Sequence, residues 1–507
     1  MRITNTMMRN NSLLNMQKNK FAYNKYLEQY NTQKKISRPS DDPTIAVRAL
    51  KYRTTLVEID QYLNNIKDAT SWMDATETYL KNVNGRMEEM ITYCTQAATG
   101  TYSAEDRKDI TTQLKQYAQY IYEQNANADY AGRYLFTGFR TDVPMLFNAA
   151  QDNVTYTINE NLDINKIEKY QYVYGQAEYD TSKSANDYAQ MASRYLSTHK
   201  IQISYDGCDP VTADKDSTAN AMKMTYVDAA GITQTVTVKT KHTVVKNSGS
   251  DLYNEHLHPG DDEVYFVPET GEVVFGDKIY DKIRAGSDLK VTYQKTEFDK
   301  NDVRPEHYFN CTARDNGTGT VINYTSAGTQ SINYQINFSQ TLTVNTEGCG
   351  AISLDIGRKI EEIINICNDY DVMEANLASV EKRISDCDEK DTTTLENLNE
   401  LKNQITTQIA LQKSVLSDAL GSGITTCQKS QNRLNAALAD HGSRYNRMMM
   451  TKEGLETQQM DTKDAKSENE DADLGEAYIN FNEADLLYQA TLGATSKILG
   501  ESLLNFI

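Results

Sequence analysis

Proline is scarce in this sequence, with only 7 prolines among 507 residues, and tryptophan occurs once. Basic residues are also in deficit, because 52 lysines and arginines face 71 aspartates and glutamates, for a net charge of -19. That balance argues against nucleic acid and against an anionic membrane surface as partners. No apolar run approaches the roughly 20 residues that a membrane-spanning helix needs. A chain of this length predicts about two to four domains.

Two further absences concern the compartment and the cysteines. The opening stretch MRITNTMMRNNSLLNM contains no apolar core, so we expect no Sec-type signal peptide. The cysteines are odd in number and form no C-x-x-C pair, which argues against a disulfide framework and against a zinc site. Taken alone, these features predict a cytosolic protein.

Helical periodicity dominates the first and last thirds of the sequence. Two adjacent apolar stripes with a period near 3.5 consist of Ile3, Met7, Leu14 and Phe21, and of Leu13, Met16, Tyr23, Leu27 and Tyr30. Further helices are expected over about 54–98, 103–131, 356–387, 393–420 and 424–466. The first of these carries an apolar seam that includes Met73, Leu80, Met87 and Cys94 at steps of seven. Ser103 and Thr393 are the expected N-caps, Gly132 is an expected helix end, and the GSG at 421–423 is an expected break.

A final helix carries one apolar face of Tyr488, Leu492, Leu499, Leu503 and Phe506, which Ile498 and its neighbours widen. An isolated amphipathic helix is only marginally stable in water. We therefore expect both terminal helices to be disordered in the free chain and to pair only on assembly.

Between about 140 and 350 the apolar period changes to two. ITQTVTVKTK, EVYFVPETGEVVFGD, DLKVTYQK and INYQINFSQTLTVN are typical of strands, and SANDYAQMASRYL predicts one short helix before them. The sequence thus predicts a mainly α protein whose N- and C-terminal halves form a long antiparallel coiled-coil rod, with an inserted β-rich domain. The expected parts are 1–37, pairing with 474–507; the rod halves 38–148 and 351–466; the β-rich insert 149–350; and the acidic spoke with the last helix, 467–507.

Two of the few prolines lie together in RPSDDP, between the first two helices. Pro39 and Pro43 end a helix and hold Arg38 and Asp42 in extended conformations. Ser40, Asp41 and Asp42 can accept hydrogen bonds from nearby backbone N–H groups or cap the following helix. We interpret this segment as a stiff spoke that joins the first helix to the rod, with SENEDADLGEA as the return crossing.

Several residues could carry chemistry, but each has a plainer interpretation. The candidates are His256 and His258 with Asp261 or Asp262 for a metal, Gly317 and Gly319 for phosphate, the acidic run 467–473 for calcium, and Cys349 as a nucleophile. Their spacings fit a polar turn, a loop, a solvated spoke and a loop thiol better. We therefore expect no catalytic, cofactor or metal site, and we expect that the protein is not an enzyme.

The helical segments resemble the flagellin superfamily. MRITNTMM, RPSDDPTIAVRAL and NADYAGRYLFTGFRTD look like its N-terminal signatures, while ADHGSRYNRM and NEDADLGEAYINFNEADLLYQ resemble its C-terminal half. Flagellins themselves usually have an Ala-rich spoke of KDDAAG type and lack the GRYLF-TG segment. The sequence is therefore more similar to the hook-associated junction branch of the superfamily.

The resemblance implies a structural subunit of the bacterial flagellum that joins the hook, through hook-associated protein 1, to the flagellin filament. It implies type III export to the cell exterior, which replaces the cytosolic expectation, and contacts with copies of itself. It also implies an export chaperone before secretion, and no cofactor. Two alternatives stay open: flagellin itself, and a soluble enzyme or binding protein with a β-rich insert.

Overall fold

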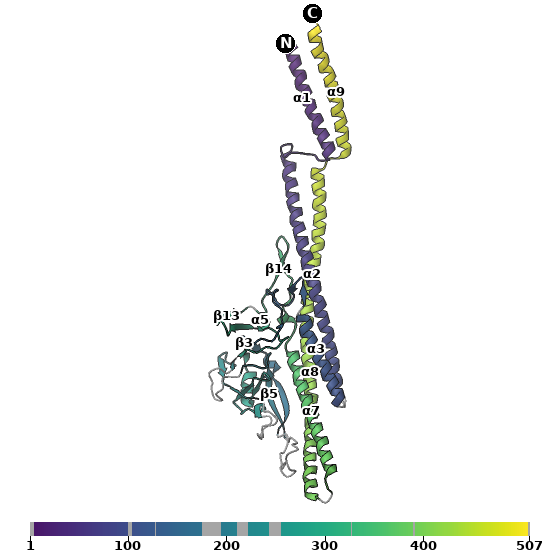
Figure 1. Ribbon diagram of the computed structural model, residues 1–507. Helices are drawn as coiled ribbons and strands as arrows, with labels where there is room; N and C mark the ends of the chain where they lie inside the picture. Colours follow the sequence, from purple (N-terminus) through teal and green to yellow (C-terminus); the bar gives the residue numbers. More distant parts are fainter. Residues whose placement is uncertain are drawn as a thin grey trace. The chain divides into compact units, whose positions relative to one another are not determined.

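The computed structural model describes residues 5–99, 104–126, 128–174, 194–209, 222–242, 255–325, 327–388 and 391–504. The chain divides into two compact units. We call Met1–Thr70, Tyr334–Leu342 and Tyr445–Ile507 the terminal unit, and Ser71–Asn333 with Thr343–Arg444 the central unit. The long helices α2 and α8 run through both (Figure 1).

Long helices make up both thirds of the chain that the sequence predicts to be helical. The helices are α1 (Asn5–Thr32), α2 (Pro43–Thr99), α3 (Ala104–Ala126), α4 (Asp277–Arg284), α5 (Pro305–Tyr308), α6 (Gly348–Ala351), α7 (Asp355–Asp386), α8 (Thr392–Glu470) and α9 (Leu474–Leu504). The mainly α fold with a β-rich insert is confirmed.

In the central unit, the predicted heptad spacing places α2 residues in the core. Met73, Leu80, Met87 and Cys94 follow one another at steps of seven and are all fully buried. On α8, His441 is also buried, and its Nε2 lies 3.0 Å from the carbonyl oxygen of Met73. A polar side chain in this seam is thus satisfied by the backbone of the neighbouring helix.

In the terminal unit, the start of α2 runs antiparallel to the end of α8. Arg53 hydrogen-bonds to Glu470, whereas Asp60, further along α2, accepts a hydrogen bond from Gln459, which precedes Glu470 on α8. The two helices therefore advance in opposite directions, as the sequence predicts for its N- and C-terminal halves.

Between these helical segments the chain forms strands. The strands are β1 (Asp129–Tyr130), β2 (Arg133–Tyr134), β3 (Val154–Leu162), β4 (Glu168–Tyr174), β5 (Arg194–Gln202), β6 (Lys223–Val227), β7 (Thr233–Val236), β8 (Val238–Thr240), β9 (Val264–Val267), β10 (Glu272–Phe275), β11 (Ser287–Lys295), β12 (Asn310–Asp315), β13 (Val321–Tyr324), β14 (Asn333–Asn337) and β15 (Gln340–Thr343). One sheet has the order β13-β12-β3-β11-β6-β7 and another the order β4-β5-β10-β9-β8.

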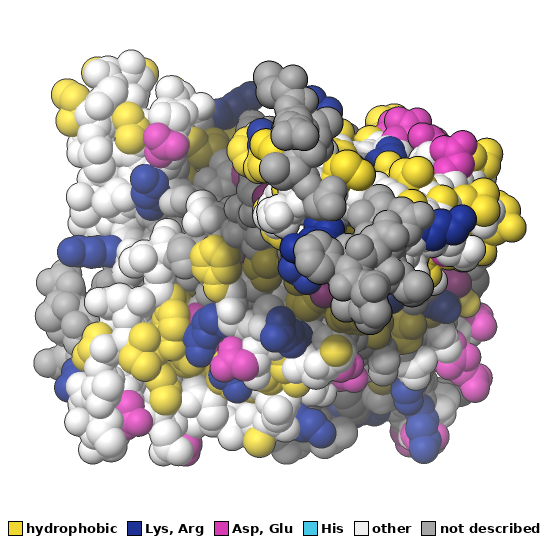
Figure 2. All heavy atoms as spheres, turned by 90° about the horizontal axis from the view of Figure 1, so that it is seen from above, with side chains coloured by type: hydrophobic (Ala, Val, Ile, Leu, Met, Phe, Trp, Pro, Cys, Tyr) yellow, Lys and Arg dark blue, Asp and Glu magenta, His cyan; other side chains and the backbone are white. Residues whose placement is uncertain are grey.

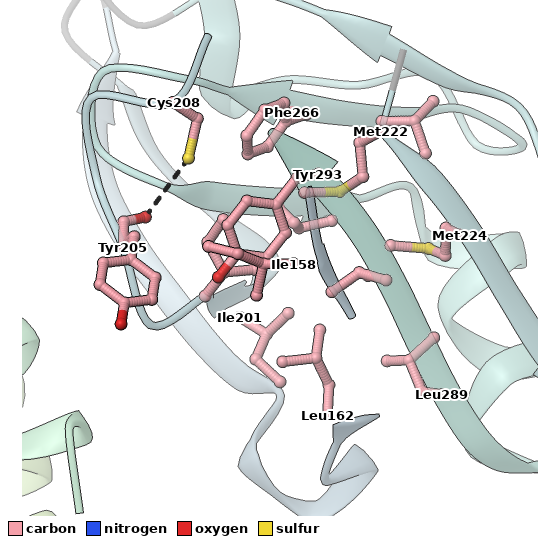
Figure 3. Close-up of a cluster of buried hydrophobic side chains, with 14 of the residues drawn as sticks. Ile158, Leu162, Ile201, Tyr205, Cys208, Met222, Met224, Phe266, Leu289 and Tyr293 are labelled. Atoms are coloured by element: carbon pink, nitrogen blue, oxygen red, sulfur yellow. Dashed lines mark hydrogen bonds between the residues drawn. The ribbon is translucent and has the colours of Figure 1, made fainter. Parts of the chain in front are cut away.

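A single apolar core joins these two sheets (Figure 3). Ile158 and Leu289 come from β3 and β11 of the first sheet, and Ile201 and Phe266 from β5 and β9 of the second. The segment ITQTVTVKTK, predicted as one strand, breaks at Thr237, so that β7 joins the first sheet and β8 joins the second. The switch lets one short segment contribute to both sides of the core.

Several predicted helix boundaries are wrong. The GSG at 421–423 does not end a helix, because α8 continues through it. A Cβ at Gly423 would lie only 2.7 Å from Cδ1 of Ile363, so this glycine permits close packing of α7 on α8. At the start of α8 the capping side chain is Asp391, which accepts from the N–H of Thr394 at 3.2 Å, rather than Thr393. Helix α2 begins at Pro43, well before residue 54.

Two other predicted features also differ from the structure. Gly132 does not end α3, which stops at Ala126; it has a φ of +78° in the turn between β1 and β2. Most of the predicted helix SANDYAQMASRYL, like the predicted cap Ser103, lies outside the described residues. Its last residues, from Arg194, begin strand β5 instead.

A buried ion-pair network joins the second sheet to α7. The Nζ of Lys200 on β5 lies 2.6 Å from Glu272 on β10 and 2.5 Å from Glu362 on α7. Lys359, one turn before Glu362, contacts both Glu362 at 2.8 Å and Glu168 of β4 at 2.6 Å. Buried charges of this kind must be paired to be tolerated. The network therefore fixes the second sheet on the helical part of the central unit.

The stability of the central unit is expected to fall in acid as Glu362 gains a proton. Burial opposes the charge of Glu362, but the ammonium groups of Lys200 and Lys359 outweigh it and lower its pKa from 4.5 to about 2. A carboxylate whose pKa is lower in the folded than in the unfolded chain stabilises the fold at pH values above its unfolded pKa. This contribution is lost as pH falls from about 4.5 to about 2. Urea unfolding between pH 5 and 2 measures this loss. Glu362→Gln should flatten the profile in that window, whereas Glu456→Gln on the exposed side of α8 should leave it unchanged.

Candidate assembly interface

Helices α1 and α9 lie side by side within one chain (Figure 1). Their contact is aromatic: the ring of Tyr23 lies 5.5 Å from that of Phe481 and 5.6 Å from that of Tyr488. The ring of Tyr30 stacks on Phe481 at 5.9 Å. Aromatic pairs at these separations add about 0.5–1.5 kcal/mol each beyond the area they bury. The structure thus pairs the two helices that the sequence assigns to each other. That they pair only on assembly stays a prediction.

The two predicted stripes of α1 have different surroundings. Tyr23 and Leu27, from the second stripe, are partly covered, and Tyr23 faces α9. Met7, Leu14 and Phe21, from the first stripe, are 65%, 50% and 75% exposed. Steps of seven place these three side chains on one face of the helix. The second stripe therefore provides the contact with α9, although Leu13 and Tyr30 stay 39% exposed, and the described residues of the first stripe are left uncovered in the single chain.

Helix α9 divides in the same way. Ala477 and Ala484 are buried, and Thr491 accepts a hydrogen bond from Asn19 of α1 at 3.4 Å. The exposed apolar side chains of α9 are Leu474, Tyr478, Ile479, Leu486, Leu487 and Leu492. We call the exposed apolar side chains of α1 and α9 together the outer face. Figure 2 shows hydrophobic side chains reaching the surface in the end-on view.

The structure describes only some of the predicted assembly residues. Met7, Leu14, Phe21 and Leu492 belong to the outer face, whereas Leu27 and Tyr488 are partly covered. Ile3 and Phe506 lie outside the described residues, as do the side chains of Ile498, Leu499 and Leu503, which are in α9. Phe481, which has a central place in the contact, was missed by the sequence analysis, although it lies seven residues before Tyr488.

The spoke from Arg38 to Pro43 is a turn followed by a helix cap. The Asp41 carboxylate accepts from the N–H groups of Ser37 at 3.2 Å and Arg38 at 2.9 Å, and the Asp41 N–H donates to the Arg38 carbonyl. Asp42 accepts from the N–H of Thr44 at 2.8 Å and so caps α2. Pro43 is the first helical residue, where its missing N–H costs nothing.

The return crossing is shorter than predicted. SENEDADLGEA does not form it as a whole, because α8 continues to Glu470 and α9 begins at Leu474. The crossing is Asp471–Asp473, and Asp473 caps α9 by accepting from the N–H of Gly475 at 2.8 Å. Acidic residues at 467–470 therefore belong to the last turn of a helix.

The two crossings are held together by backbone and charge contacts. The N–H of Lys35 donates to the Glu470 carbonyl at 2.7 Å, and Ala472 donates to the Gln33 carbonyl at 2.9 Å. The ammonium group of Lys34 contacts the carboxylate of Asp471. Hydrogen bonds from Lys34 and Ser467 lower the pKa of Asp471 below its usual value. The crossings thus form one connected structure rather than two separate linkers.

Glu470, at the end of α8 beside the crossings, is a residue of this site that the sequence did not predict. It is 3% exposed, and Arg53 donates to both of its carboxylate oxygens at 3.0 Å. Such bidentate pairs fix geometry as well as adding energy. The sequence offered no signal for this pair, because 417 residues separate the partners and each lies in an ordinary charged helix.

The residues considered for metal binding or catalysis have other contacts in the structure. Among the described residues there is no cluster of three or more histidines, cysteines or carboxylates that could hold a metal ion. Asp261 and Asp262 pair with Lys278 and Lys282. Burial raises the pKa of Cys349 to about 11, which keeps this thiol protonated and unreactive at neutral pH.

The glycines of the DNGTGT motif belong to a hairpin turn. Asp315 accepts from the N–H of Gly317 at 2.9 Å, and Gly319 has a φ of +70° between strands β12 and β13. This hairpin does not open a helix, so it lacks the N-terminal N–H groups that a phosphate-binding loop uses.

Both ends of the chain match known families. Residues 3–141 match the bacterial flagellin N-terminal helical region, and residues 424–507 match the bacterial flagellin C-terminal helical region. These ranges include α1, α9, the spoke and the return crossing. Both ends of the chain are therefore similar to flagellin helical regions. Within the described part of the chain, no helix is both long and apolar enough to span a bilayer.

The curated relatives include flagellar hook-associated proteins and flagellins. Flagellar hook-associated protein 3 of Salmonella typhimurium is 28% identical over 142 residues, which are 28% of this chain and 45% of the relative. The protein of the same name from Escherichia coli is 27% identical over the same shares of each chain. Flagellin FlaB1 of Treponema pallidum is 28% identical over 114 residues, 22% of this chain and 40% of the relative. The chain therefore spans a little less than half the length of these relatives.

Solved structures overlap this chain more loosely. FlgL of Xanthomonas campestris has 10% identity and a TM-score of 0.30, covering 82% of this chain and 99% of that one. The flagellar junction protein FlgL of Legionella pneumophila has 12% identity and a TM-score of 0.26, covering 80% and 99%.

Replacing both prolines of the spoke should disturb assembly more than stability. In Pro39→Ala/Pro43→Ala the helix can continue backwards through the Asp41 turn, which displaces α1. The unfolding free energy should change by only about 1 kcal/mol, while incorporation into flagella should fall at least roughly tenfold (about 1.4 kcal/mol). Pro259→Ala/Pro268→Ala, in loops of the central unit, serves as the control. Normal motility of cells carrying the spoke variant would contradict this role.

Proposed function

We propose that this protein is a structural subunit of the bacterial flagellum, placed at the junction between hook and filament. The observation that carries the proposal is the outer face, where Met7, Leu14 and Phe21 lie exposed on a helix that matches the flagellin N-terminal region. Burying one such side chain contributes roughly 1.5–3 kcal/mol. A surface of this kind is typical of subunits that cover it with neighbouring copies.

The junction role is favoured over the filament role by the relatives. The two hook-associated relatives match over 142 residues, whereas flagellin FlaB1 matches over 114. The Pro-containing spoke and the GRYLF-TG segment support the same choice. Flagellin remains the second candidate. A soluble enzyme is disfavoured, because the relatives carry the names of structural flagellar proteins.

In this proposal the partners are hook-associated protein 1, flagellin and copies of this chain, with an export chaperone before secretion through the type III channel. Residues 1–37 and 474–507 would form the polymerisation helices, 38–148 and 351–466 the two rod halves, and 149–350 the insert. The assembly contacts would be made by the outer face together with Ile3, Ile498, Leu499, Leu503 and Phe506.

Immunogold electron microscopy of flagella from the source cells tests the location. Label confined to the boundary between hook and filament supports the junction role. Label along the whole filament would assign the chain to the flagellin role, and absence of label from flagella altogether would overturn the proposal.

A further inference from the structure

Two cysteines from opposite thirds of the chain meet in the core of the central unit. Cys94 lies near the end of α2, and Cys427 lies in α8. Both are free thiols, and the exposed fraction is 0% for Cys94 and 2% for Cys427. Interaction with the Cys427 thiol raises the pKa of Cys94, and interaction with the Cys94 thiol lowers the pKa of Cys427. The contact therefore brings two sulfur atoms together where either residue alone would pack as a small apolar side chain.

The helix packing places the Cys94 sulfur against the turn of α8 that leads to Cys427. Gly423 lies one turn before Cys427 on α8, and a Cβ at that position would be 3.9 Å from the Sγ of Cys94. Cys94 thus points at the stretch of α8 between Gly423 and Cys427. Elsewhere in the core, Cys208 instead approaches the Tyr205 carbonyl (Figure 3), with 3.7 Å between sulfur and oxygen.

We propose that Cys94 and Cys427 form an intramolecular disulfide when the chain meets an oxidising environment. The bond would join α2 to α8 covalently and close a loop that contains both sheets. A cross-link stabilises mainly by restricting the unfolded chain, and more so for a long loop. In a reducing compartment the same pair stays as two thiols, so the chain can still unfold there.

The chemistry needs only a small-molecule disulfide, such as oxidised glutathione, as the oxidant. Either thiol can be the first nucleophile once it is deprotonated, and the sequence of steps is written here with Cys427 first. The thiolate of Cys427 attacks one sulfur of the small-molecule disulfide. The S–S bond of that disulfide breaks, and one small thiol leaves. Cys94 then gives up its proton and attacks the sulfur of Cys427, which releases the second thiol. Two protein thiols are oxidised and one small disulfide is reduced. Because both sulfurs are buried, the reaction takes place while the chain folds or opens locally.

Refolding the full chain in glutathione buffers tests the proposal. The denatured, reduced protein is refolded with oxidised or with reduced glutathione, and free thiols are then blocked before tryptic digestion without reductant. Mass spectrometry should find a peptide pair linked through Cys94 and Cys427 after oxidative refolding. The melting temperature of that sample should be higher by roughly 4–8 °C than that of the reduced sample.

Matched variants separate this bond from other oxidation. Cys94→Ala and Cys427→Ala should each abolish the shift in melting temperature, whereas Cys367→Ala, at another buried cysteine in α7, should keep it. The linked peptide is sought in the unmodified chain, so the result does not depend on whether a variant folds. A folded, oxidised chain without that peptide, or with other cysteines linked, would overturn the proposal. None of these readouts depends on assembly into flagella.

Discussion

A chain carrying Leu14→Asp and Phe21→Asp is expected to stay folded and to lose its incorporation into flagella. Both side chains are at least half exposed in the single chain, at 50% and 75%, so the unfolding free energy should change by no more than about 0.5 kcal/mol. In the assembly we propose, both become buried. Losing two apolar contacts at roughly 1.5–3 kcal/mol each should weaken subunit addition by roughly 100- to 10,000-fold. Each aspartate would also leave an unpaired charge in the contact.

The control for this variant adds the same charge to the same helix. Asn15→Asp with Asn31→Asp introduces two aspartates at exposed positions of α1, neither of which is three or four residues from Met7, Leu14 or Phe21. Urea unfolding compares the monomers, and immunoblots of sheared and purified flagella compare incorporation. If the Leu14/Phe21 variant were recovered in flagella as well as the control, the outer face would not be the assembly surface.

The second large effect is expected inside the central unit. Lys200→Met leaves the carboxylates of Glu272 and Glu362 buried without their shared cation, which lies 2.6 Å and 2.5 Å from them. Removing one partner of a buried ion pair typically costs about 3–5 kcal/mol. Urea unfolding at pH 7 should show a loss of this size. The Lys200→Met substitution would loosen the second sheet from α7, because Glu362 is the α7 partner of Lys200.

Two further variants make that result interpretable. Lys239→Met removes the partner of Glu263 from a pair in the same sheet, but the lysine side chain is 56% exposed. A surface pair contributes only about 0–1 kcal/mol, so this change should have little effect. Adding Glu272→Gln and Glu362→Gln to Lys200→Met removes the stranded charges and should recover much of the loss. A loss for Lys200→Met no larger than that for Lys239→Met would show that the network does not hold the sheet.

Local features of the chain were determined by the sequence, because short-range physics specifies them. Steps of seven predicted the buried row Met73, Leu80, Met87 and Cys94. Asp42 was predicted as a possible cap of the following helix, and it caps α2, although the helix starts at Pro43 and not near residue 54 as predicted. Alternating β-branched residues predicted the hairpin of β9 and β10. Each of these depends on residues within a turn or two of one another.

Tertiary structure alone decided the features that depend on distant neighbours. The GSG at 421–423 looks like a stop, yet it lies inside α8, because packing against Ile363 outweighs the local cost of glycine. The sequence showed two apolar stripes on α1 but not which one faces α9, since both have helical spacing and only the placement of Tyr23 against Phe481 distinguishes them. Likewise, Arg53 and Glu470 are ordinary surface residues in the sequence. They become a pair, with Glu470 buried and Arg53 exposed, only because α2 and α8 run antiparallel and bring the two crossings together.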